Sequence, residues 1–430
     1  MKEKYAPLFE PIGLKHGGRL ENRFAMCPMV VFAADPATGQ PTEEDIKYFE
    51  RRSKFADLLI TGAITVQENI QGHPKQLSIF NNEAIDAYSK LAAAIKNNGS
   101  KAIGQIQHPG REGAYGCYVT GKAYAPSAIE FPFLQYKVTE LTEDEVWQMV
   151  KDFGLAAQRL LKAGFDGVEI HGANHYLIQQ FFSSYSNQRT DYWGGSFEKR
   201  MNFAIEVTKE VLKVARAENP EAIVGYRISP EEIHGEMVGY DLDDSLKLID
   251  KLLEQDLDFL DLSSAAGGNF GKDAYKAMPQ RGDFTEPVSL VIKKFVAGRV
   301  PVVISGTIRS ADEALDALNY GDVVCRHKEV HHDERKRANR EDPYCQNCRF
   351  ASLPALREPL VEKPSVQAPD NERNKLFRIA GKDCAPIDAG RDEPKKHARR
   401  EQRKADRRRE RIDLVQCGEG REILLEARQL

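Results

Sequence analysis

The sequence has no apolar stretch long enough to cross a membrane, because no run approaches the ~18–20 residues that a spanning helix needs. Its first eleven residues lack the apolar core of a secretory signal. The seven cysteines follow no regular spacing, which argues against a disulfide framework and indicates a reducing compartment. A net charge of −4 argues against generic nucleic-acid binding. We therefore expect a cytoplasmic protein with no membrane or nucleic-acid partner, and a homo-oligomer is left open.

Several catalytic signatures are also missing. No Gly-x-Gly-x-x-Gly follows the first apolar stretch, so a Rossmann dinucleotide site is not supported. We find no strong metal-ligand spacing, no Ser/His/Asp arrangement and no nucleophile elbow, and so expect no metal in the main part of the chain.

The composition changes abruptly after residue 324. Up to that point the chain has a net charge of −10 and 34 of its 37 aromatic residues. Residues 325–430 have a net charge of +6, three aromatic residues and five of the seven cysteines. So few large apolar side chains cannot easily offset the entropy of ordering. We predict one large domain over 1–324 and a basic, Arg-rich tail over 325–430 that is disordered or partly helical.

Two other interpretations of the tail stay open. Its basic residues favour an arm that binds nucleic acid or another anionic partner, although acidic residues are mixed among them. A metal site is the other, formed by Cys345-x-x-Cys348 with the nearby His331 and His332.

The first 324 residues alternate between two patterns. Apolar, β-branched stretches predict strands at 23–30, 57–64, 101–108, 167–171, 223–229, 259–264 and 301–306, with an eighth beginning at 322–324. Helical spacing occurs at 84–96, 143–163, 197–217, 245–255, 288–296 and 311–318. Thr142 with Glu145, and Ser310 with Glu313, predict capping boxes. Eight such units indicate a (β/α)8 barrel, with a doubly wound sheet as the alternative.

Polar side chains follow several of these strands, at the end where barrel enzymes carry their sites. His171, Asn174 and Tyr176 share one strand-to-helix turn. The imidazole and the amide can donate hydrogen bonds to one carbonyl oxygen, and the phenol can deliver a proton to a basic carbon. By contrast, His16, His73 and His234 are isolated, and we interpret them as structural.

Other strand ends offer groups suited to a cofactor. Gln105 and Arg227 provide amide and guanidinium donors for a heteroaromatic edge that gains negative charge. The loop from Ser305 through Gly306 to Thr307 offers backbone N–H groups for a phosphate. Activation of a carbonyl without a nucleophile or metal indicates that a cofactor performs the difficult step.

These residues resemble the old yellow enzyme family of FMN-dependent NAD(P)H:flavin oxidoreductases and ene-reductases. The resemblance covers about 8–324 and is most specific in the string Asn187-x-Arg189-x-Asp191-x-x-Gly194-Gly195-Ser196-x-Glu198-x-Arg200. It implies a TIM barrel in which NAD(P)H reduces FMN and the hydride then passes to the β-carbon of an α,β-unsaturated carbonyl compound. His171 and Asn174 would hold the carbonyl, and Tyr176 would protonate the α-carbon.

The same resemblance implies the cofactor contacts. Residues expected along FMN are Pro28 and Met29 at the flavin edge, Ala63 near the isoalloxazine, Gln105 at the pyrimidine part, Arg227 at N1–C2=O, and Ser305, Gly306 and Thr307 at the phosphate. The loop 265–284 would border the substrate entrance.

The sequence departs from the family at two places that matter here. His175 stands where relatives usually have Gly, so this position requires a backbone angle that side chains rarely adopt. After Val324 the family's Gly-Arg or Ala-Arg and closing helix are missing, which we interpret as translation in a shifted reading frame or as a lineage-specific tail. We therefore expect the eighth β/α unit to be incomplete, leaving an open sheet edge. An inactive barrel without FMN, or an interaction protein using its tail, are the alternative functions.

Overall fold

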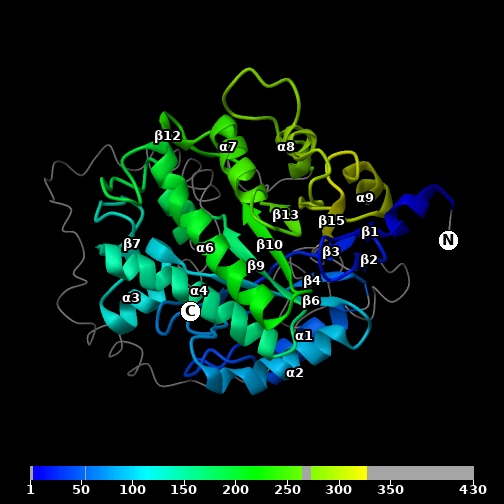
Figure 1. Cartoon of the computed structure of the whole chain (residues 1–430), viewed down its shortest axis with the longest axis horizontal. Helices are drawn as coiled ribbons and strands as arrows, with labels where there is room; N and C mark the ends of the chain where they lie inside the picture. The colour runs from blue at the N-terminus through cyan, green and yellow to red at the C-terminus, as the bar shows by residue number, and fades with distance from the viewer. Residues whose placement is uncertain (1–2, 54, 264–272, 327–430) are drawn as a thin grey trace, which may run out of the picture.

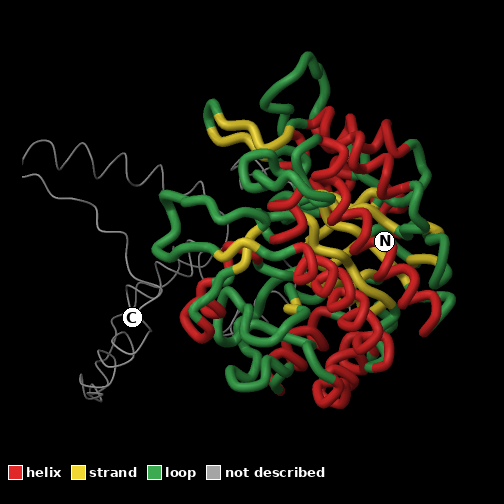
Figure 2. Tube along the Cα trace, turned by 60° about the vertical axis from the view of Figure 1, so that its left-hand side comes forward, coloured by secondary structure: helices red, strands yellow, loops and turns green. Residues whose placement is uncertain are grey.

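Eight parallel strands form a closed barrel in the computed structural model, which describes residues 3–53, 55–263 and 273–326. In chain order they are β3 (Phe24–Met26), β4 (Leu58–Ile60), β6 (Lys101–Gln107), β9 (Gly167–Gly172), β10 (Ile223–Ile228), β13 (Phe259–Leu262), β14 (Val302–Ile304) and β15 (Val323–Arg326). Each pairs with the next, and β15 pairs with β3. The helices surround these strands (Figures 1 and 2). The predicted (β/α)8 barrel is therefore confirmed, and the alternative, a doubly wound sheet, is wrong.

A helix follows each of the first seven barrel strands. They are α1 (Glu43–Arg52), α2 (Ile85–Lys96), α4 (Glu143–Lys162), α6 (Phe197–Glu218), α7 (Leu242–Leu253), α8 (Val288–Val296) and α9 (Ala311–Ala317). The predicted capping boxes at Thr142 and Ser310 are both present. Apolar spacing does not predict helix α1, because seven of its ten residues are charged. The sequence marks its start only by a capping box at Thr42.

Alternate side chains of the strands pack in two separate apolar layers. Those pointing outward meet the helices in the large core, whereas Ile103, Ile223 and Phe259 belong to a cluster inside the barrel. A Cβ on Gly225 would lie 2.1 Å from the ring of Phe259, so only glycine lets this ring fill the barrel interior. The apolar filling occupies the N-terminal part of the barrel, and the C-terminal part is left for polar side chains.

The eighth strand corrects the expectation of an open edge. β15 continues through Cys325 to Arg326, and its register pairs Cys325 with Ala25 of β3. Val323 and Cys325 are buried inside the barrel, while Val324 faces the outer core. Closure is possible because strand pairing uses backbone groups and a buried cysteine packs as a small apolar residue. The helix expected after this strand, and the tail with its predicted properties, lie outside the described residues.

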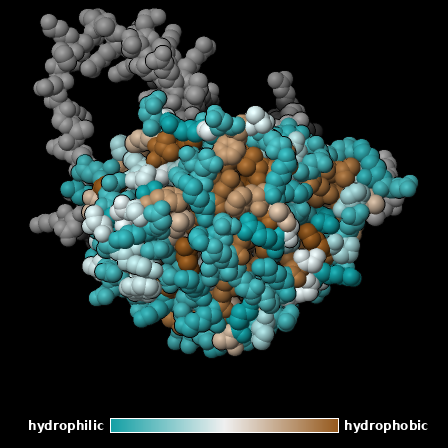
Figure 3. All heavy atoms as spheres, turned by 45° about the horizontal axis from the view of Figure 1, so that its top comes forward, coloured by the Kyte–Doolittle hydropathy of each residue, from teal (hydrophilic) through white to brown (hydrophobic). Residues whose placement is uncertain are grey.

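Shorter elements lie at the ends of the barrel. The strands are β1 (Ile12–Gly13) with β2 (Arg19–Leu20), β5 (Ile64–Thr65), β7 (Tyr124–Ala125) with β8 (Thr139–Glu140), and β11 (Glu232–His234) with β12 (Met237–Tyr240). The helices are α3 (Ala114–Thr120), α5 (Leu177–Phe182) and the 3-10 turns Glu3–Phe9, Asn82–Ala84, Gly110–Glu112 and Ala274–Lys276. Figure 3 shows hydrophilic residues over most of one face, with smaller apolar patches among them. No helix in the described part is long and apolar enough to cross a membrane.

Candidate active site

Strand register brings the predicted polar residues together inside the barrel. Arg227 on β10 is aligned with His171 on β9 and with Asp261 on β13. Gln105 on β6 is aligned with Glu169, two residues before His171 on β9. Aligned residues of neighbouring parallel strands point to the same side, so these five side chains share the C-terminal part of the barrel interior. All five are buried.

The guanidinium of Arg227 lies beside two carboxyl groups, those of Asp261 and Glu169. Its Nε lies 3.5 Å from Asp261 Oδ2, and the carboxyl groups of Asp261 and Glu169 are close enough to influence each other electrostatically. Burial and the neighbouring Asp261 raise the pKa of Glu169 well above its usual range. Burial acts to lower the pKa of Arg227, but Asp261 and Glu169 outweigh it and raise that pKa. Arg227 is therefore the counter-charge of two closely spaced carboxyl groups.

Gln105 has a partner that the sequence did not indicate. Its Nε2 donates to Glu169 Oε1 at 2.6 Å, and its backbone N–H donates to Thr61 Oγ1 at 3.1 Å. The predicted contact with a pyrimidine edge stays a prediction. Gln107, the next inward residue on β6, is buried and its Oε1 has no hydrogen-bond partner among the described residues. The two-residue repeat of a strand is the signal that could have added Gln107 to the site.

The end of β9 and the turn that follows it present the three residues predicted to handle substrate. Asn174 and His175 both adopt left-handed backbone angles, with φ of 56° and 61°. His175 therefore has the left-handed backbone angle that the sequence predicted. Such an angle costs conformational energy and is found most often at functional sites. Tyr176 then begins helix α5, and its ring packs edge-on against His171 with centroids 5.0 Å apart. The predicted trio is therefore adjacent in space as well as in sequence.

Hydrogen bonds orient the amide of Asn174. Ser263 Oγ donates to Asn174 Oδ1 at 2.6 Å, and Arg227 Nη2 donates to Ser263 Oγ at 3.4 Å. The backbone N–H of Asn174 donates to Ser229 Oγ at 3.0 Å. Because the amide oxygen is engaged, its NH₂ group is the end available to another acceptor. The sequence did not predict this role for Ser263.

His171 is held in its neutral form. Burial, reinforced by the charge of Arg227, lowers the pKa of His171 well below its usual range. Its Nδ1 has no hydrogen-bond partner in the described part of the chain. A buried polar atom without a partner costs ~1–3 kcal/mol, so its persistence points to a ligand that completes the site.

The segments predicted to contact FMN also meet at this end of the barrel. A Cβ on Gly62 would lie 2.1 Å from the backbone oxygen of Met29, so the segment of Pro28 and Met29 lies directly against that of Ala63. Pro28 and Ala63 are buried and Met29 is half-buried. This close approach brings together two of the segments predicted to contact the flavin.

The predicted phosphate loop follows β14. Ser305 is buried and its Oγ donates to Leu262 O at 3.2 Å, whereas Gly306 and Thr307 are half-buried. Gly306 has φ of 148° and Thr307 φ of 26°, both outside the usual range for side-chain-bearing residues. The other expected border of the site, loop 265–284, is described only from residue 273.

These observations fit a bound FMN. The partnerless Gln107 Oε1 and His171 Nδ1, with the buried guanidinium of Arg227, supply acceptors and donors at one end of the barrel. A heteroaromatic ring with amide-like N–H and C=O groups matches such a donor set. A Cβ on Gly306 would lie 3.0 Å from the backbone nitrogen of Tyr275, so glycine allows the phosphate loop to pass close to that segment.

His108 gives a pH-dependent prediction. Burial lowers its pKa to about 3, while its Nδ1 accepts the Gly110 N–H at 2.9 Å. The unfolded chain takes up a proton on this residue near pH ~6.5, so stability falls as the pH drops, by up to ~1.4 kcal/mol per pH unit. His108→Asn keeps an acceptor but cannot titrate. We expect urea unfolding between pH 7.5 and 4.5 to show a shallower loss of stability in the variant. Parallel curves for variant and wild type would contradict this assignment.

Comparisons with known proteins identify the class. A profile of the NADH:flavin oxidoreductase / NADH oxidase family matches residues 7–329. The "Probable NADH-dependent flavin oxidoreductase YqiG" of Bacillus subtilis is 38% identical over 322 residues, covering 75% of this chain and 84% of that protein. An NADPH dehydrogenase of Bacillus subtilis is 34% identical over 260 residues, covering 60% and 73%. The old yellow enzyme homologue of Zymomonas mobilis superposes with a TM-score of 0.63 at 26% identity, over 78% of this chain and 93% of that one.

Together, the barrel and its donor set define an oxidoreductase that works with a flavin. The chain belongs to the NADH:flavin oxidoreductase / NADH oxidase family, and is an old yellow enzyme-like protein that uses FMN and NAD(P)H. The resemblance stated from the sequence is thereby confirmed.

Proposed function

We propose that this protein reduces the carbon–carbon double bond of an α,β-unsaturated carbonyl compound. The observation that carries the proposal is the arrangement at the end of β9 and in the turn that follows, where a neutral, buried His171 and an oriented Asn174 amide adjoin the phenol of Tyr176. FMN, when bound, supplies the hydride chemistry. The residues of the chain then have to bind the carbonyl, stabilise charge on its oxygen and deliver a proton.

His171 and Asn174 take the first two tasks. Two hydrogen-bond donors aimed at one oxygen stabilise the negative charge that develops there when the β-carbon is reduced. A neutral imidazole suits this role because it donates a hydrogen bond without adding a buried charge beside Arg227. Tyr176 takes the third task, giving its phenolic proton to the α-carbon. Pro28, Met29, Ala63, Gln105, Arg227, Ser305, Gly306 and Thr307 stay our proposed FMN contacts.

We assign these activities to the domain proposed over 1–324, extended by the two residues that complete β15. The setting proposed is the cytoplasm. What supports it is that the seven cysteines follow no regular spacing of the kind that a disulfide framework has.

The test follows each half of the reaction separately. The full chain is mixed with excess FMN and desalted, and its visible spectrum is recorded. We expect about one equivalent of FMN, bleaching by NADH or NADPH under nitrogen, and recovery of the oxidised spectrum on adding a cyclic enone. The matching saturated ketone is the control and should restore no colour. Recovery with neither compound, in a protein that NADH does bleach, would reject the proposed acceptor while leaving the family assignment intact.

A further inference from the structure

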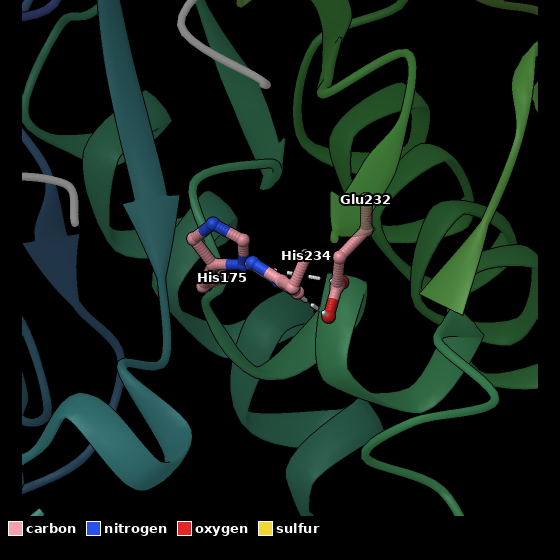
Figure 4. Close-up of side chains that lie close together, drawn as sticks. All are labelled: His175, Glu232 and His234. Atoms are coloured by element: carbon pink, nitrogen blue, oxygen red, sulfur yellow. Dashed lines mark ion pairs between the residues drawn. The ribbon is translucent and has the colours of Figure 1, made fainter. Parts of the chain in front are cut away.

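Outside the flavin site, two histidines and a glutamate converge at the C-terminal rim of the barrel. His175 lies in the turn after β9, and Glu232 and His234 lie at the two ends of β11. One ligand atom from each side chain lies within 4.8 Å of the others. His175 Nδ1 is 3.9 Å from Glu232 Oε2, and His234 Nε2 is 3.6 Å from Glu232 Oε1. Figure 4 shows both imidazoles turned toward this carboxylate.

The carboxylate at the centre of the group is a buried and oriented one. Glu232 is 1% exposed, and its two oxygens accept hydrogen bonds from Gln179 Nε2 at 2.9 Å and Ser183 Oγ at 3.0 Å. Gln179 also accepts the His175 backbone N–H on its Oε1 at 2.8 Å, so one amide positions two members of the group. Each carboxylate oxygen keeps a further lone pair for a ligand. Outer hydrogen bonds of this kind orient the ligands of metal centres.

The local backbone is shaped to bring the three residues together. His175 has φ of 61°, an angle that turns the chain sharply between Asn174 and helix α5. A Cβ on Gly239 of β12 would lie 2.5 Å from Ser183 Oγ and 2.9 Å from the Glu232 carboxyl carbon, so glycine admits the carboxylate here. The neighbouring buried Arg111 is ion-paired with Glu112, Nε to Oε1 3.2 Å, which reduces its repulsion of a second cation.

We propose that His175, Glu232 and His234 bind a divalent cation of the zinc type. Two imidazole nitrogens and one carboxylate oxygen are a common ligand set for Zn²⁺, with water in the fourth position. In a tetrahedral site the ligand atoms lie about 3.3–3.5 Å apart, so the longest separation in the group has to close by up to about 1.5 Å. The His234 side chain is 37% exposed and the His175 side chain 28% exposed, which gives the ion a route from solvent and the imidazoles room to move.

The cation ties the hairpin of β11 and β12 to the turn that carries the substrate residues. His175 separates Asn174 from Tyr176 in that turn, whereas Glu232 and His234 belong to the hairpin. The inference is independent of the proposed reaction, because metal binding is measured without turnover.

Cobalt(II) is the probe, because its visible bands in a tetrahedral N/O site lie at longer wavelengths than oxidised flavin absorbs. The full-length, FMN-loaded protein is treated with chelator, dialysed, titrated with Co²⁺ and then challenged with Zn²⁺. We expect one equivalent of Co²⁺ to produce a band that Zn²⁺ abolishes. His175→Gly, which relieves the backbone angle, and His234→Ala, at an exposed position, should each lose that equivalent. Gln179→Leu should weaken affinity by roughly 10–100-fold.

The tail needs its own control, because Cys345, Cys348, His331 and His332 are also potential ligands. A full-length variant with both cysteines changed to Ser and both histidines changed to Ala should keep the equivalent assigned to the rim. Loss of binding in this tail variant, together with unchanged binding in His175→Gly and His234→Ala, would overturn the proposal. So would the lack of stoichiometric binding in the wild type.

Discussion

Replacing Tyr176 with Phe will leave the reduction of FMN by NADH unchanged and slow the reduction of an enone by about 10²–10⁴-fold, the usual contribution of a positioned general acid. The two half-reactions differ because only the second places a proton on carbon. The substitution is conservative, since the Tyr176 ring packs edge-on against His171 and its backbone starts helix α5. Phe keeps both features. Anaerobic stopped-flow absorbance measures each half-reaction alone.

An acceptor that needs no carbon protonation is the matched control for this variant. Ferricyanide takes electrons singly, so it should reoxidise wild type and Tyr176→Phe at the same rate. If the variant lost enone reduction and NADH oxidation in equal measure, the side chain would be maintaining the site as a whole, and the assignment of Tyr176 as proton donor would be wrong.

The parts of the structure that the sequence predicted are those set by local pattern. Continuous apolar strands between amphipathic helices are enough to indicate the barrel, and the ends of those strands are enough to locate His171, Asn174 and Tyr176. The closure by Cys325 and Arg326 was missed because it depends on backbone pairing with β3, a property that side-chain composition does not report.

Contacts between distant segments were beyond the sequence. Glu169 and Asp261 sit within apolar strands, and only the register of β9, β10 and β13 shows that both lie beside Arg227. Ser263 orients Asn174 across two strands. His234 was interpreted as structural for the same reason, because its approach to His175 depends on how the hairpin after β10 folds back.

The buried charges around Arg227 lead to the largest expected effect on stability. Arg227→Leu leaves the neighbouring carboxyl groups of Glu169 and Asp261 without their counter-charge inside the barrel. Breaking a buried ion pair by removing one partner costs about 3–5 kcal/mol, a large share of the ~5–15 kcal/mol that stabilises a typical domain. We expect urea unfolding of the FMN-free protein at pH 7.5 to show this loss. Arg227→Lys, which keeps the charge, should lose less.

The pH dependence of this loss distinguishes charge from packing. Without the arginine, the pKa of Glu169, which burial and Asp261 already raise, rises further above that of the unfolded chain, so folding takes up a proton and becomes weaker as the pH rises through the raised value. The deficit of Arg227→Leu relative to wild type should therefore shrink as the pH is lowered from 8 toward 5. Adding Asp261→Asn to Arg227→Leu should recover part of it, because one buried charge is removed with its partner. If the loss of unfolding free energy were the same at every pH and were not reduced in the double variant, Arg227 would stabilise the barrel by filling space. The two carboxyl groups would then not need the positive charge of Arg227.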